Sequence, residues 1–216
     1  MSRLTDTGLL VALTIGVASG CLPYTVGGTA ATTPEGEWAP SGNMYFIPNA
    51  IETPGDSVSG PLIGGDVEAR FGLSPRSDVG IRIPSYSGIV VSYKRRLGTE
   101  ADDRPGVAAM GAAGIVNLAS HAYVEGTLIA SARESDRFTP YIGVRIMHVV
   151  PIARGAVDDS PTAGGFFGAR VGTRNRGISP EIGIYYDRSA LGLRKSTVIF
   201  VPAVTLHGAD LLDLLR

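Results

Sequence analysis

The three histidines are the residues of this sequence whose side chains most readily do chemistry, as metal ligands or proton carriers. His121, His148 and His207 lie far apart and show none of the spacings typical of metal ligands. No local arrangement of serine, histidine and aspartate indicates a nucleophile with its base. The sequence therefore predicts no metal site, no cofactor and no enzymatic activity.

Three other local patterns have simpler explanations than chemistry. The acidic pairs at 102–103 and 158–159 have the oxygen ligands that divalent cations prefer, but both fall in expected loops, where carboxylates are normally solvated. The glycines of "GFFGARVG" lack the strand-to-helix context of a phosphate-binding loop. In "YKRR", strand alternation points Arg95 away from Lys94 and Arg96, which argues against one basic patch for lipid phosphate.

Charged residues recur instead on one face of the expected strands. Alternation places apolar side chains such as Val79, Ile81 and Ile83 on the opposite face. Acids and bases are balanced on the polar face, so they can pair in a narrow interior, where an unpaired ion costs several kcal/mol. We predict a polar network in the lumen made of Asp66, Glu68, Arg70, Asp78, Arg82, Lys94, Arg96, Glu125, Arg145, Arg170, Glu181 and Asp187.

Composition and the rhythm of apolar runs predict an all-β fold. The 216 residues include 29 Gly and 14 Pro and only 18% charged residues, which favours turns and strands over long helices. We expect an antiparallel up-and-down β-barrel of about 10 strands (8–10), most near the ~9–11 residues that a tilted strand needs to cross a bilayer. The expected strands are 41–48, 65–73, 78–85, 88–97, 106–117, 121–132, 139–149, 163–173, 178–187 and 196–206.

Connections and aromatic residues fit a barrel whose two ends differ. Short turns are expected at 74–77, 135–137 and 174–176, and long loops at 49–64 and 151–162. Pro75 suits the second position of a type I turn.

Aromatic residues near strand ends fit an interfacial girdle, although core packing explains them equally well. They are Tyr45, Phe46, Tyr86, Tyr93, Tyr141, Phe166 and Tyr186.

The N-terminus has the pattern of a targeting segment. Arg3 precedes the apolar run "GLLVALTIGV", which is too short to span a bilayer as a helix. The "ASGC" that follows resembles the bacterial lipobox, in which small residues precede a cysteine that is acylated and becomes the mature N-terminus. The resemblance implies a signal peptide at 1–20 and lipidation of Cys21, and Leu22 after it implies delivery to the outer membrane.

The remaining chain divides into three parts. Residues 21–37 are expected to form a lipidated N-terminus and flexible tether, because they are rich in Pro, Gly and Thr and show little periodicity. Residues 38–207 form the expected β-barrel domain. Residues 208–216 form a tail or short helix, since "ADLLDLLR" has leucines at amphipathic spacing.

The stretch "ARFGLSPRSDVGIRIPSYSGIVVSYKRRL", Ala69 to Leu97, is similar to the hairpins of small Gram-negative outer-membrane β-barrel proteins. Their strands often read as an aromatic residue followed by Gly-Leu, a tight polar turn and an alternating return strand. The resemblance covers 38–206 in rhythm. One departure concerns the end of the chain, because such barrels usually finish in a strand with a C-terminal aromatic residue, whereas here "ADLLDLLR" follows the last strand.

These features predict a lipid-anchored outer-membrane β-barrel with its apolar face toward lipid and a filled polar lumen. Its role would be structural, adhesive or the passage of small solutes, and its expected partner is outer-membrane lipid, with a small solute or an envelope protein as further candidates. Lys+Arg 19 against Asp+Glu 20 gives no argument for nucleic acid. The alternative is a soluble periplasmic lipocalin-like lipoprotein that is apolar inside and binds a hydrophobic ligand. A lipid-modifying outer-membrane enzyme is a third hypothesis.

Overall fold

The computed structural model describes residues 22–52, 59–85, 87–98, 105–154, 160–186 and 198–208. Several predictions fall outside these residues: the signal peptide, Cys21, the two acidic pairs, Asp187 and the C-terminal helix. The described part comprises the barrel and the segment that leads into it.

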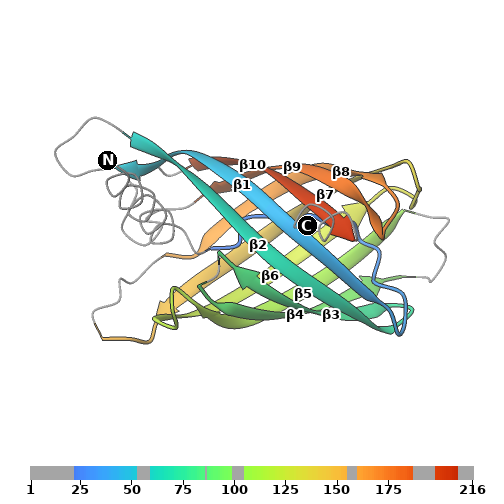
Figure 1. Cartoon of the computed structure of the whole chain (residues 1–216), viewed down its shortest axis with the longest axis horizontal. Coiled ribbons are helices and arrows are strands. Elements are labelled where there is room, and N and C mark those ends of the chain that lie inside the picture. Colours follow the sequence, from blue (N-terminus) through green and yellow to red (C-terminus); the bar gives the residue numbers. More distant parts are fainter. Residues whose placement is uncertain are drawn as a thin grey trace, which may run out of the picture.

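Ten antiparallel strands in the described residues close into a barrel, in which β1 pairs with both β2 and β10 (Figure 1). The strands are β1 (Trp38–Glu52), β2 (Ser59–Ser74), β3 (Ser77–Pro84), β4 (Ile89–Leu97), β5 (Gly106–Val116), β6 (His121–Ser131), β7 (Phe138–Pro151), β8 (Thr162–Gly172), β9 (Arg176–Tyr186) and β10 (Val198–Gly208). Within the same residues no helix is long and apolar enough to cross a membrane. The predicted all-β, antiparallel barrel is confirmed.

The barrel has two distinguishable ends. At the turn end the chain enters β1 and leaves β10, and the β2–β3, β4–β5, β6–β7 and β8–β9 connections lie there. In the β2–β3 turn the hydroxyls of Ser74 and Ser77 lie 2.7 Å apart on either side of Pro75. The loop end is the opposite end, which carries the β1–β2, β3–β4, β5–β6, β7–β8 and β9–β10 connections.

The first two strands are longer than the sequence predicts. Their pairing continues past a register shift between Ile47 and Ile51, and Glu52 pairs with Ser59. Most of the long loop expected at 49–64 is therefore strand. Pro48 suggested an end to the strand because proline cannot donate to a ladder, but the irregularity beside it lets the pairing resume.

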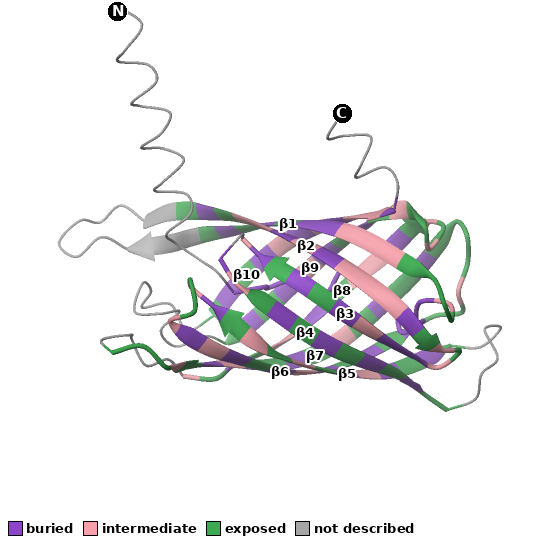
Figure 2. Ribbon diagram, turned by 60° about the horizontal axis from the view of Figure 1, so that its bottom comes forward, coloured by how far each residue is buried: buried purple, intermediate pink, exposed green. Residues whose placement is uncertain are grey.

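Side chains alternate between the interior and the outer face along each strand, as the purple and green bands of Figure 2 show. In β4 the polar residues Ser92, Lys94 and Arg96 are buried, whereas Val91 and Tyr93 are about half exposed. The outer face is formed largely by Ile, Val, Leu and Phe. This orientation is opposite to the apolar interior that the lipocalin-like alternative requires.

The aromatic residues divide between the two faces, so the predicted girdle is only partly correct. Phe46, Tyr93 and Tyr186 lie on the outer face. Tyr45, Tyr141 and Phe166 were wrongly grouped with them and are buried in the lumen. At the turn end, Trp38 and Phe138 occupy the outer face and Trp38 packs on Phe71 with ring centroids 5.0 Å apart. Because alternation flips the face at every residue, proximity to a strand end did not decide the side.

Candidate functional site in the barrel lumen

The predicted polar network lies inside the barrel. All of its members that the structure describes point inward, and all but Arg70 are less than 10% exposed. Asp187 lies outside the described residues. The charges therefore face one another across a space from which lipid and bulk water are excluded, so their pairing decides whether they are tolerated.

One ionic cluster joins β2, β3 and β4. Glu68 lies opposite Arg82 and Asp78 lies opposite Lys94 in the strand register. The Glu68 carboxylate accepts hydrogen bonds from Arg70 and from Arg82, the latter at 2.7 Å. Asp78 accepts two hydrogen bonds from Arg70 and lies 3.7 Å from the Lys94 ammonium. The shared carboxylates bind the three strands together on the inner face.

A second cluster lies on β6 and β7. Arg145 donates to the Glu125 carboxylate at 2.6 Å and to the Tyr123 hydroxyl at 3.1 Å. Thr127 and Tyr123 donate the remaining hydrogen bonds to Glu125, each at 2.7 Å. The Glu125 carboxylate thus accepts hydrogen bonds from three side chains within the barrel, as a buried charge requires.

A third cluster lies at the turn end. Arg170, a predicted network residue, donates to Glu134 of the β6–β7 connection, and Arg174 lies 3.9 Å from the same carboxylate oxygen. Glu134 and Arg174 were not predicted, because both lie in connections, where alternation assigns no face.

The remaining space in the barrel is occupied by the protein's own N-terminal residues. Residues 22–34, called the lumen segment below, are almost all buried, including Tyr24, Thr25 and Ala30. The segment runs inside the wall from the loop end to the turn end (Figure 1), and Glu35 forms a bridge with Gly72 just before the chain enters β1. The sequence predicted a flexible tether at 21–37, whereas the structure packs residues 22–34 against the barrel wall.

Glu181 of β9 binds the backbone of the lumen segment. Its two carboxylate oxygens accept hydrogen bonds from the amides of Val26, at 3.0 Å, and Gly27, at 2.8 Å. Tyr141 donates a third at 3.0 Å. A network acid expected to pair with a base therefore binds peptide N–H groups, which is a charge-assisted arrangement.

Other wall side chains bind the segment's carbonyl groups. Lys94 donates to the carbonyl of Ala31 at 2.6 Å, and Arg82 donates to that of Thr25 at 3.0 Å. At the turn end, the Thr33 amide donates to Asp78 at 2.7 Å. Because these contacts are to the main chain, they satisfy polar groups of a segment that is not part of the sheet.

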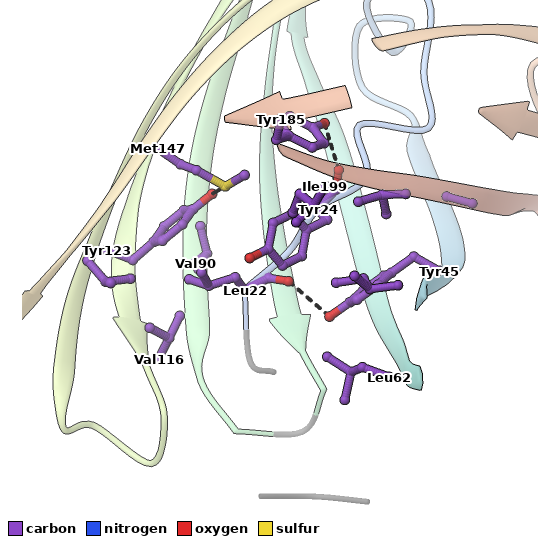
Figure 3. Close-up of a cluster of buried hydrophobic side chains, with 14 residues drawn as sticks. Leu22, Tyr24, Tyr45, Leu62, Val90, Val116, Tyr123, Met147, Tyr185 and Ile199 are labelled. Carbon is purple, nitrogen blue, oxygen red and sulfur yellow. Dashed lines mark hydrogen bonds between the residues drawn. The ribbon is translucent and has the colours of Figure 1, made fainter. Parts of the chain in front are cut away.

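Apolar packing holds the part of the segment near the loop end (Figure 3). Tyr24 lies between Tyr45 and Tyr185, with ring centroids 6.0 and 5.8 Å away. The hydroxyl of Tyr45 donates to the Leu22 carbonyl at 2.9 Å, and that of Tyr185 donates to the Tyr24 carbonyl at 2.8 Å. Each of the two wall tyrosines therefore packs its ring against Tyr24 and donates a hydrogen bond from its hydroxyl to the segment backbone.

Gly27 lies tightly against the wall. Its φ of +62° is left-handed, and a Cβ there would lie 1.9 Å from the Thr205 hydroxyl oxygen and 2.9 Å from the Asn43 amide oxygen. The neighbouring Gly28 has space, since the nearest atom to its Cβ position would be the Val26 carbonyl oxygen at 3.8 Å. Only glycine fits at 27, whereas 28 tolerates a side chain.

Open space along the middle of the lumen segment is small. A cavity of about 70 Å³ lies between it and the wall, next to Arg70, Lys94 and His207. This volume suits a few water molecules. The lumen is filled by side chains, as predicted, and also by the segment, which was not predicted.

The histidines do not form a common site. His121 contacts Asn117 and Ser120 at the loop end, and His207 contacts the Ser179 hydroxyl at 2.7 Å. His148 lies between the inward-facing Met147 and Val149 of β7, so alternation places it on the outer face. Among the described residues, no group of three His, Cys, Asp or Glu side chains could hold a metal ion.

The sequence matches no protein-family model and no curated protein sequence. Its structure is similar to that of the outer-membrane protein OprG from Pseudomonas aeruginosa, at 14% identity over 84% of this chain and 97% of that one, with a TM-score of 0.31. It is also similar to an outer-membrane channel from Pseudomonas putida F1, at 11% identity, 85% and 99% coverage and a TM-score of 0.38. Neisserial surface protein A matches at 12% identity, 78% and 95% coverage and a TM-score of 0.34.

Proposed function

We propose that this protein is an outer-membrane β-barrel, lipid-anchored at Cys21, whose lumen is sealed by its own N-terminal segment. The observation that carries the proposal is the occupied lumen inside an apolar outer face. Of the roles predicted from sequence, the seal supports a structural or adhesive one and argues against solute passage.

The outer face supports a position in a bilayer. Residues along the middle of β7 show the pattern clearly, since Ile142, Val144 and Ile146 are 61%, 57% and 54% exposed. A soluble monomer rarely exposes a continuous apolar patch beyond a few hundred Å², whereas here such residues recur around the whole barrel. The closed sheet also leaves no strand edge unpaired, as the hydrocarbon region requires.

The lumen supports a non-conducting barrel. A solute would have to displace the segment and break its bonds to Glu181, Lys94 and Arg82. Each hydrogen bond to a charged group contributes about 1.5–3 kcal/mol. The segment is thus bound along its length.

Three measurements on the full-length protein test the proposal. Membranes should release it only with detergent, and the extracted protein should migrate differently on gels before and after boiling, with the boiled sample as control. In planar bilayers it should produce no steady conductance. A mature chain that is monomeric and soluble in plain buffer would rule out the spanning barrel, and a steady open channel would rule out the seal.

A further inference from the structure

The direction of the lumen segment has a consequence for where the mature protein begins. Leu22 packs in a cluster with Val90, the second residue of β4, and Val116, the last residue of β5. Ile199, the second residue of β10, belongs to the same cluster. All three wall residues lie at the rim of the loop end, so the segment begins there.

The other end of the segment is fixed at the turn end. Thr33 donates to Asp78, which follows the β2–β3 turn. The Gly36 amide then donates to the Gly72 carbonyl, and the Gly72 amide donates to the Glu37 carbonyl, each at about 3 Å. The segment therefore crosses the whole barrel before β1 crosses it again in the opposite direction.

We propose that the N-terminal end of the mature chain is threaded through the barrel and presented at the loop end, on the side opposite β10's final residue. This inference rests on the proposed function and adds an orientation to it, in which the loop end faces the cell exterior. Consecutive Cα atoms lie about 3.8 Å apart, so a residue joined to Leu22 begins at the loop-end rim. An acyl group one residue before Leu22 then enters the lipid leaflet around the loop end.

The opposite arrangement conflicts with the contacts. An acyl group in the leaflet around the turn end would require the chain to return through the lumen from Leu22, with a single residue available. One residue spans at most about 3.3–3.6 Å, so it cannot carry the chain back from the loop-end rim to the turn end. The order of the wall contacts gives the same direction, with Glu181 on the amides of Val26 and Gly27 near the middle and Asp78 on the amide of Thr33 at the turn end.

Antibody access to one short epitope, placed at three positions in separate full-length chains, tests this proposal. The positions are between Cys21 and Leu22, after Arg154 in the β7–β8 connection, and after Gly208. In intact cells the first two should be labelled equally, and the third only after the outer membrane is permeabilised. Folding of each chain is checked by migration before and after boiling.

The outcomes separate the inference from the proposed function. If the epitope before Leu22 behaves like the one after Gly208, while the Arg154 epitope is still labelled in intact cells, threading is overturned and the spanning barrel stands. If the Arg154 epitope also reacts only in permeabilised cells, the proposed orientation fails. Should the first epitope prevent folding, a single lysine inserted there and reacted with a membrane-impermeant amine reagent gives the same comparison, mapped by mass spectrometry.

Discussion

Replacing Gly27 with alanine should release the lumen segment, whereas the same change at Gly28 should not. At position 27 the new methyl group would lie 1.9 Å from the Thr205 hydroxyl oxygen and 2.8 Å from its Cβ, in a backbone of φ +62°. At position 28 the nearest atom lies 3.8 Å away. The two variants add the same methyl group to neighbouring residues, and they differ in the space around that group and in the backbone φ.

The size of the effect follows from two contributions. Overpacking a close-packed site costs about 1–3 kcal/mol, and a left-handed non-glycine residue costs about 1–2 kcal/mol. Together they weaken docking of the segment by about 2–5 kcal/mol, which is a factor of about 30 to several thousand at about 1.4 kcal/mol per tenfold. The Thr205 hydroxyl cannot move away freely, because it donates to Asn43 at 2.6 Å.

Hydrogen exchange of peptides from the lumen segment measures this equilibrium, since amides exchange through opening. Gly27→Ala should accelerate exchange of the Val26 and Thr33 amides by the factor above, and Gly28→Ala should leave it near that of the unmodified protein. Amides of β7 serve as an internal reference for the barrel itself. Equal exchange in the two variants would refute the close approach at Gly27.

Two further changes probe the wall and the outer face. Glu181→Ala should accelerate exchange of the Val26 and Gly27 amides, because each buried amide left without an acceptor costs about 1–3 kcal/mol. Glu181→Gln keeps one acceptor oxygen and should accelerate exchange less. Equal acceleration in the two variants would contradict the assigned hydrogen bonds. Val144→Arg should lower the folding free energy in lipid vesicles, measured by guanidinium titration, by about 2–4 kcal/mol, while Phe138→Arg at the strand end should cost about 0–1 kcal/mol. A reversed order would place these residues away from lipid.

The strands and their faces were predictable because alternation is a local property. In β4 the pattern of Ser92, Lys94 and Arg96 against Val91 and Tyr93 depends only on the pleat. The length of β1 was not predictable, because Pro48 marks an end in most sheets and the register shift that lets pairing resume depends on β2. Tyr45 was misplaced because closeness to a strand end does not distinguish it from its neighbour Phe46, which alternation puts on the opposite face.

The lumen segment was missed because its contacts connect residues far apart in the chain. Glu181 binds Val26 across 155 positions, and no short-range pattern indicates such a partner. One signal was present: from Leu22 to Pro34 the sequence contains no charged residue, which is unusual for a tether in water. Small uncharged residues suit a chain that must fit inside a barrel.

A disulfide between the lumen segment and the wall tests the sealed lumen most directly. A Cβ at Gly106 would lie 3.4 Å from the Ala30 Cβ, close to the spacing of about 3.5–4.5 Å in disulfides. Ala30→Cys with Gly106→Cys should therefore form a crosslink, detected as a linked peptide by mass spectrometry. Ala30→Cys with Val107→Cys, whose second cysteine faces outward, should not. Free thiols in the first pair, or equal crosslinking in both, would contradict a segment threaded through the barrel.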